Sequence, residues 1–303
     1  MNKEISLIDT NNYATMAQAM GMVTGEKNDK KENLPRLRMI HKGFMGEKIV
    51  EGETVKVEVI AAGSYRLELP NGDYVYSKTV TIRPFVQRFM YKRWIQNNAA
   101  QAGEKQGDYC KTVMADNLNM DLKDNMGGFN CGKPAGYVKD FQSLPEATQK
   151  LIKEIKRNRV ILGLIKLDKP MDETGKKVKQ DEVPFIYEID NREAFKTMGE
   201  PFIRLSEMKR LPPQHNIKLT AVQGKSRTGT VVFYLPVAEL DISKVVDITD
   251  EDQASFSLFL EFIQTCNDSV IKSWDFKNKN IMKQVDKDVV DDFIDIETDG
   301  DII

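Results

Sequence analysis

A period of two in the apolar and polar residues is the feature that most limits what this chain can fold into. It runs through 54–60, 64–69 and 73–82, as in Thr54-Val-Lys-Val-Glu-Val-Ile60. A period of two places apolar side chains on one face of a strand. Pro70-Asn-Gly72 separates the second run from the third, and Asn and Gly accept the positive φ of a tight hairpin turn. We therefore expect three antiparallel strands here.

The second half of the chain predicts more strands than helices. Apolar runs bounded by turn residues indicate strands over 159–167, 183–189, 201–205, 217–223 and 230–235, and we expect the last two to form a second hairpin around Gly224–Gly229. Helical periodicity, with a capping-box spacing at Ser143 and Glu146, indicates helices over 146–157, 191–198 and 250–267. Residues 96–136 have no period and hold seven glycines or prolines, so we expect an insertion there. The sequence predicts a β-dominated α+β fold.

Composition narrows the class of protein. The 303 residues are 41% hydrophobic, which suits a folded core, and the longest apolar runs are far too short to cross a bilayer. Three widely spaced cysteines do not suggest a disulfide framework. Only two histidines occur, which leaves few imidazoles for catalysis. We expect a soluble protein of the reducing cytoplasm that makes no membrane contact.

The net charge of −2 conceals a division along the chain. Residues 286–303 hold eight acidic residues and one lysine, hence −7, which leaves +5 for residues 1–285. We expect a flexible arm over 1–35, a basic body over 36–283 with an insertion at about 96–136, and an acidic tail over 284–303. Such a tail can compete with a polyanion for a basic groove.

The end of the tail interleaves acidic and apolar residues, a pattern suited to docking on a partner protein. The residues expected to make this contact are Asp291, Asp292, Phe293, Asp295, Asp299, Asp301, Ile302 and Ile303.

One twelve-residue segment combines cations with aromatic rings, which is what single-stranded nucleic acid requires for its phosphates and bases. Its candidate binding residues are Arg83, Phe85, Arg88, Phe89, Tyr91, Lys92, Arg93 and Trp94. As a strand, the segment would place Arg83, Phe85, Phe89, Tyr91 and Arg93 on one face. As a helix, it would cluster Phe85, Arg88, Phe89 and Lys92 instead. Core packing is the alternative role for the rings.

A second basic set follows the predicted helix over 146–157. Its candidates are Lys153, Lys156, Arg157 and Arg159, and we expect Tyr187, Lys225 and Arg227 to complete a cleft. Taken alone, these lysines and arginines are equally consistent with a solvated surface.

Two other kinds of chemistry have weaker support. Cys110 and Cys131 are candidate zinc ligands, but paired C-x-x-C ligands are missing, so we expect no cofactor. The loop carboxylates of Asp168, Asp172, Glu173, Asp181 and Glu182 are the candidates for a metal-dependent nuclease. They lie among lysines, as solvated loop charges do, and we expect no enzymatic activity.

The order of these parts resembles the helix-destabilising single-stranded DNA-binding proteins of tailed phages. The local similarity lies in Val160–Pro170, Phe185–Ile189, Phe195 and Ile217–Gly224. The resemblance implies an oligonucleotide-binding (OB) antiparallel barrel with helical insertions and disordered termini, cooperative sequence-tolerant binding and self-association through the arm. In that family the insertion holds zinc on a His and Cys cluster, whereas this chain lacks the paired cysteines.

The resulting hypothesis is a non-enzymatic protein that protects and organises single-stranded DNA in phage DNA replication, recombination and repair. Its tail would recruit replication proteins such as polymerase, helicase or primase in the host cytoplasm. Two alternatives remain open: a virion structural or assembly protein, and a metal-dependent nuclease.

Overall fold

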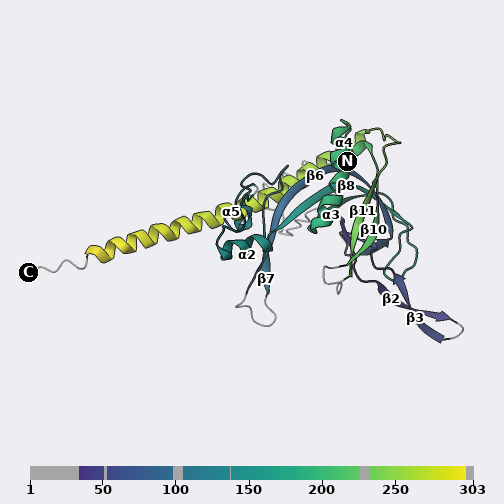
Figure 1. Cartoon of the computed structure of the whole chain (residues 1–303), viewed down its shortest axis with the longest axis horizontal. Helices are drawn as coiled ribbons and strands as arrows, with labels where there is room; N and C mark the ends of the chain where they lie inside the picture. Colours follow the sequence, from purple (N-terminus) through teal and green to yellow (C-terminus); the bar gives the residue numbers. More distant parts are fainter. Residues whose placement is uncertain (1–33, 51–52, 98–104, 137, 226–231, 298–303) are drawn as a thin grey trace, which may run out of the picture. The chain divides into compact units, whose positions relative to one another are not determined.

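The computed structural model describes residues 34–50, 53–97, 105–136, 138–225 and 232–297, with no side chains described for 48–50 and 280–297. The fold is β-dominated α+β (Figure 1). Nearly all of the expected arm, together with Arg227, Asp299, Asp301, Ile302 and Ile303, lies outside the described residues.

One mixed sheet contains most of the strands. These are β1 (Arg36–Met39), β4 (Tyr65–Glu68), β5 (Tyr74–Ser77), β6 (Thr79–Gln96), β7 (Gly107–Lys111), β8 (Lys156–Asp168), β9 (Val183–Ile189), β10 (Ile217–Lys225) and β11 (Val232–Leu240). Their order is β11-β10-β6-β8-β9-β1-β4-β5, with β7 paired to the end of β6. The β1–β9 pairing is parallel and the other pairings are antiparallel. A separate hairpin joins β2 (Phe44–Val50) to β3 (Glu53–Ile60).

Short helical segments connect the strands, and one long helix follows them. They are η1 (Asn130–Gly132), α2 (Glu146–Glu154), α3 (Arg192–Thr197), α4 (Glu200–Glu207), η2 (Pro212–Gln214) and α5 (Asp250–Glu297). Within the described part of the chain, none of these helices combines the length and apolar character that a bilayer crossing requires.

Two predicted hairpins are confirmed by their strand pairing. β4 and β5 pair around Asn71 and Gly72, and Gly72 adopts a φ of 92°, which glycine tolerates best. β10 and β11 pair over their full lengths, as expected for the second hairpin. The expected group of three strands is wrong in one respect, because β3 pairs with β2 and not with β4.

Three other predictions of secondary structure need correction. Residues 201–205 belong to α4, where Pro201 occupies the first helical turn and needs no hydrogen-bonded N–H. Helix α2 ends at Glu154, so Lys156 and Arg157 lie on strand β8. Helix α5 continues past the expected end at residue 267 as far as Glu297, so the backbone of the predicted disordered tail is helical over 284–297.

A β-bulge in β6 decides which side chains face outward. The register with β8 shifts between Pro84 and Val86, so Phe85 has no partner in the ladder. Before the bulge, Val80 and Ile82 point into the main core, and after it Val86 and Met90 point to the opposite face. An inserted residue reverses the alternation because the side-chain period is two. The predicted common face for Arg83, Phe85, Phe89, Tyr91 and Arg93 is therefore wrong.

Gly163 of β8 lies opposite the bulge, and only glycine fits there. A Cβ on this residue would lie 2.2 Å from the carbonyl oxygen of Arg83, which is backbone and cannot move aside. The close approach of β6 and β8, which run side by side as long strands in Figure 1, depends on this glycine.

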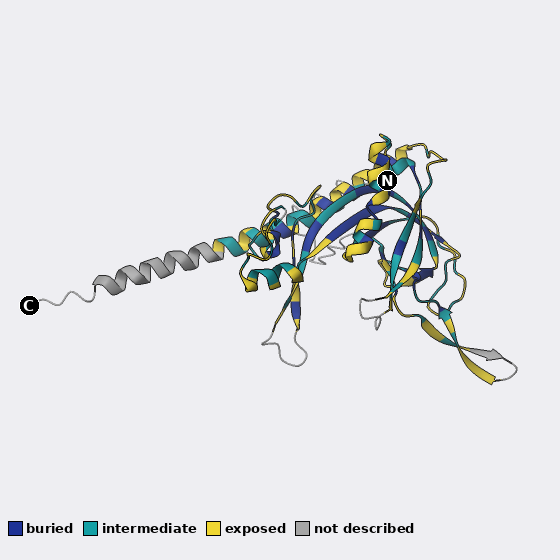
Figure 2. Ribbon diagram, viewed as in Figure 1, coloured by how far each residue is buried: buried dark blue, intermediate teal, exposed yellow. Residues whose placement is uncertain are grey.

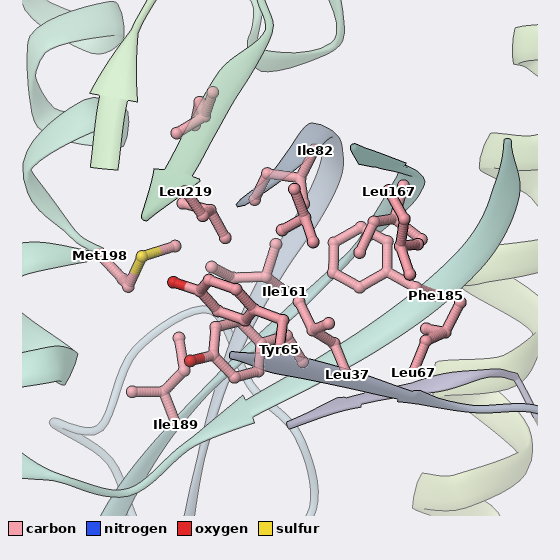
Figure 3. Packing of buried hydrophobic residues seen from close by; sticks show 14 of the residues in the cluster. Leu37, Tyr65, Leu67, Ile82, Ile161, Leu167, Phe185, Ile189, Met198 and Leu219 are labelled. Atoms are coloured by element: carbon pink, nitrogen blue, oxygen red, sulfur yellow. The ribbon is translucent and has the colours of Figure 1, made fainter. Parts of the chain in front are cut away.

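The main core lies on the inner face of the curled sheet (Figure 3). Its members include Leu37, Tyr65, Leu67, Ile161 and Phe185, packed against Met198 at the end of α3. The Tyr65 hydroxyl donates to the Thr220 carbonyl at 2.9 Å, although β4 and β10 are not neighbours in the sheet. The sheet therefore curls on itself, but among the described residues β5 and β11 do not pair to close a barrel.

A second cluster lies on the opposite face, called here the outer face. Phe259 and Ile263 of α5 pack on apolar residues of β6, β8 and β9, including Met90, Val160 and Ile186. Figure 2 shows β6 and β8 buried over much of their length, whereas the described part of the β2–β3 hairpin is largely exposed. Helix α5 thus covers one part of the outer face and leaves the rest of it open.

Candidate nucleic-acid interface

The open part of the outer face contains two adjoining cavities, which we call the outer groove. The first, of about 380 Å³, is lined by Arg36, Leu37, Arg38, Lys92, Trp94, Tyr109, Glu154, Lys156, Asn158, Glu188 and Asp190. The second, of about 440 Å³, is lined by Arg36, Lys92, Asp108, Tyr109, Lys111, Asn125, Glu188, Ser269, Val270 and Ser273. The four shared residues make the two cavities continuous.

Strand register explains why these side chains converge. Lys92 of β6 lies opposite Lys156 of β8 on one side and Lys111 of β7 on the other. Trp94 lies opposite Tyr109 in the same ladder. Directly opposed residues project to the same face of a sheet, so the bulge in β6 determines that these side chains point outward.

Trp94 and Tyr109 form an exposed aromatic pair at one end of the outer groove. Their ring centroids are 4.8 Å apart in an edge-to-face arrangement, and the residues are 45% and 52% exposed. The ammonium group of Lys92 lies 5.9 Å from the Tyr109 centroid. Large rings are normally buried, so an exposed pair beside a cation is a surface on which a planar ligand can stack.

Carboxylates hold the cations of the outer groove in place. Glu188 pairs with Lys92 and lies 3.7 Å from Arg36, and Asp190 lies 2.6 Å from Lys156. Burial acts to raise the pKa of Glu188, but Lys92 and Arg36 outweigh it and hold that pKa below its usual value. The groove has five basic and four acidic residues, so an anionic ligand must compete with carboxylates for these cations.

Three predicted binding residues of β6 make contacts within the body and do not line the outer groove. Arg83 pairs with Asp252 at the start of α5. Phe85 packs edge-to-face on Phe259, with ring centroids 5.6 Å apart, and Tyr91 is buried in the packed insertion. These three side chains stabilise the body and are not open to a ligand.

Residues from the second basic set also pack into the body. Arg159 is buried, donates to the Phe195 carbonyl and to Gln87, and burial lowers its pKa to about 10. Tyr187 is buried in the main core, where burial raises the pKa of its hydroxyl. Neither side chain can contact a base in this conformation.

The remaining predicted residues are scattered. Phe89 is half-buried against Phe195, over which Arg157 also lies, and Arg93 is half-buried. Arg88 pairs with Asp116 at 3.0 Å, and Lys153 lies over the Phe141 ring. Lys225 is exposed at the end of β10. Of the predicted set, the outer groove brings together Lys92, Trp94 and Lys156.

Sequence reasoning missed four groove residues: Arg36, Arg38, Tyr109 and Lys111. The basic, partly alternating segment 34–42 was a usable signal for β1. Tyr109 and Lys111 lie in the insertion, where short segments without periodicity gave no indication of strand β7.

The insertion is a packed unit, and helix α5 forms hydrogen bonds with it. Asn267 of α5 accepts from the Met114 amide at 2.7 Å and donates to its carbonyl at 3.0 Å. Trp274 and Asn278 donate to the carbonyls of Gly128 and Gly127 at 3.0 and 2.9 Å. The Trp274 ring is also covered by Lys123, 3.9 Å from its centroid. Trp274 is therefore a structural residue, unlike Trp94.

Cys110 and Cys131 come together with Asp124 inside the insertion, with ligand atoms within 4.8 Å of one another. The Asp124 carboxylate already accepts from the amides of Met126, Gly128 and Cys131. A hydrogen bond with Cys110, together with burial, raises the pKa of the Cys131 thiol. Three donors without a histidine do not fit the four-ligand geometry of structural zinc. The absence of a cofactor stays a prediction.

The loop carboxylates proposed for nuclease chemistry do not assemble either. Asp172 accepts from the hydroxyl and amide of Thr174 and from the Lys176 amide, which shapes its own loop. In the part of the chain that the structure describes, these carboxylates form no group of three potential ligands.

No protein-family model matches the chain, and no curated protein or solved structure is significantly similar to it.

Proposed function

We propose that this protein binds single-stranded nucleic acid in the outer groove, without catalysis and without reading base sequence. The observation that carries the proposal is the exposed Trp94–Tyr109 pair beside a row of cations drawn from β1, β6, β7 and β8. Aromatic faces accept any base, and cations neutralise phosphates whatever the sequence.

The balance of charges in the outer groove predicts how binding proceeds. Phosphates displace the carboxylates from Lys92, Arg36 and Lys156, and the counterions condensed on the strand are released. Stacking on Trp94 and Tyr109 then adds a contribution that depends little on salt.

The proposal includes an OB-type body that stays partly open. Its support is the curl of the sheet, which brings Tyr65 to Thr220 and strand β11 against the turn at Gly63. A Cβ on Gly63 would lie 2.5 Å from the Tyr234 ring, so the turn before β4 and strand β11 approach closely there.

We propose a wider biological role on the same basis. A body of charge +5 joined to a segment of charge −7 suits a protein that organises single-stranded DNA in phage replication, recombination and repair. The acidic segment would contact replication proteins such as polymerase, helicase or primase, and copies would associate along the strand in the host cytoplasm.

A fluorescence titration across a salt series tests the proposal. The full-length chain is expected to bind a thymidine oligomer more tightly than the matched duplex, with Trp94 quenched and with affinity falling as salt rises. A Trp274→Phe variant leaves Trp94 as the sole tryptophan and assigns the quenching. Equal binding to single strand and duplex, or none at low salt, would reject the proposed function.

Neutralising Glu188 is expected to strengthen binding. Glu188→Gln keeps a hydrogen-bond acceptor but frees Lys92 and Arg36 from a carboxylate, so affinity at low salt should rise several-fold and its salt dependence should steepen. Glu193→Gln, which removes an exposed acid from α3, is the matched control and is expected to have little effect. Weaker binding by Glu188→Gln would contradict the competition between carboxylates and phosphates.

A further inference from the structure

The outer face continues beyond the groove onto β4 and β5. Across the β1–β4 ladder, Arg36 lies opposite Glu68 and Arg38 opposite Arg66. Across the β4–β5 ladder, Glu68 lies opposite Tyr74. Opposed residues project to the same side of a sheet, and Arg36 and Arg38 line the groove, so Arg66, Glu68 and Tyr74 lie on the outer face as well.

This continuation repeats the charge pattern of the groove. Glu68 lies 2.7 Å from the Arg66 guanidinium and 3.2 Å from that of Arg38, so one carboxylate bridges two cations. Glu188 bridges Lys92 and Arg36 in the same way. Each set has one net positive charge and a pair of cations fixed in position, which suits successive phosphates of one strand.

An exposed ring ends the continuation, as Trp94 and Tyr109 end the groove. Tyr74 is 41% exposed, and the Arg66 guanidinium lies 4.8 Å from its centroid. Tyr74 also borders a cavity of about 440 Å³ whose charged lining is Asp73, Asp172, Glu173 and Lys179. Three carboxylates beside one lysine disfavour a phosphate there and leave the space to an uncharged base.

We propose that a single strand leaving the outer groove crosses β1 and β4, with phosphates on Arg38 and Arg66 and a base stacked on Tyr74. This inference rests on the proposed function and extends its binding site. Five strand spacings separate β6 from β5, or about 24 Å at ~4.8 Å each. That length corresponds to about seven nucleotides at the ~3.4 Å spacing of stacked bases.

Oligomers of two lengths distinguish binding in the groove from binding along its continuation. The full-length chain and its variants would be titrated with thymidine oligomers of about four and about twelve nucleotides. Tyr74→Leu is expected to weaken binding of the longer oligomer roughly 5- to 100-fold and to leave the shorter one unchanged. Arg66→Gln should reduce the salt slope for the longer oligomer by about one.

Two controls separate the loss of the Tyr74 ring from a loss of folding and from the loss of an unrelated charge. Tyr74→Phe keeps the ring and is expected to retain most of the long-oligomer affinity, whereas a loss of folding in Tyr74→Leu would appear in its thermal midpoint. Lys196→Gln removes an exposed cation on α3, away from the proposed path, and should behave as wild type. Because Arg66 does not line the groove and pairs with Glu68 on the outer face, Arg66→Gln tests the path and leaves the groove residues unchanged.

The outcomes distinguish the two proposals. If Trp94→Leu weakens both oligomers while Tyr74→Leu and Arg66→Gln bind the longer one as wild type does, the path across β4 and β5 is wrong and the groove remains. If the wild-type chain binds neither oligomer, the proposed function itself fails. Selective loss of the longer oligomer in Tyr74→Leu and Arg66→Gln would support the path.

Discussion

Removing the rings of the outer groove is expected to produce the largest loss of binding. Trp94→Leu or Tyr109→Leu should each weaken single-strand affinity by about 1–3 kcal/mol, which is roughly 5- to 150-fold. The two rings are in edge-to-face contact, so the double variant is expected to lose less than the sum of the single losses. Titration of a thymidine oligomer at fixed salt measures the effect.

An exposed ring outside the groove provides the control for this prediction. Phe129→Leu changes an exposed ring that packs against Trp274, outside the residues lining the groove, and should leave affinity near the wild-type value. The salt slope should stay the same in Trp94→Leu, because stacking releases few counterions. Unchanged affinity in both Trp94→Leu and Tyr109→Leu would exclude stacking in the groove.

Loss of Asp252 is expected to produce the largest change in stability. The carboxylate pairs with Arg83, and the two side chains are 5% and 12% exposed. Asp252→Ala leaves the guanidinium buried against Phe85 without a counter-charge, so the free energy of unfolding should fall by about 3–5 kcal/mol. Chemical denaturation monitored by circular dichroism would measure the change.

Two further variants separate the ion pair from the helix cap. Asp252 also accepts from the Thr249 amide at 2.9 Å, and Asp252→Asn keeps an acceptor for that bond while removing the charge. Glu251→Ala removes an exposed acid from the same helical turn and should cost well under about 1 kcal/mol. If Asp252→Ala were as stable as Glu251→Ala, the buried pair would not anchor α5 to β6.

The anchoring of α5 links stability to the binding site. Helix α5 begins at the Arg83–Asp252 pair, covers the apolar part of the outer face and then provides Ser269, Val270 and Ser273 to the groove. A variant that loosens its start should therefore also disturb this wall of the groove.

The sequence by itself determined the local elements whose signals are short and chemical. Asn71 and Gly72 specified the turn of the β4–β5 hairpin, and the apolar run over 159–167 specified the buried part of β8. Of the rings and cations predicted in β6, Lys92 and Trp94 line the open groove, and their role in binding stays a prediction. Such signals work because turn geometry and side-chain alternation depend on neighbouring residues alone.

Only the tertiary structure decided which side chains face solvent and which residues they meet. The bulge at Phe85 reversed the alternation of β6, which placed Trp94 outward and Tyr91 in the packed insertion. Pairing with β7 brought Tyr109 to Trp94 from a segment that had no recognisable period. The physical reason is that periodicity defines two faces of a strand, whereas the layers packed on each face determine which one remains open to a ligand.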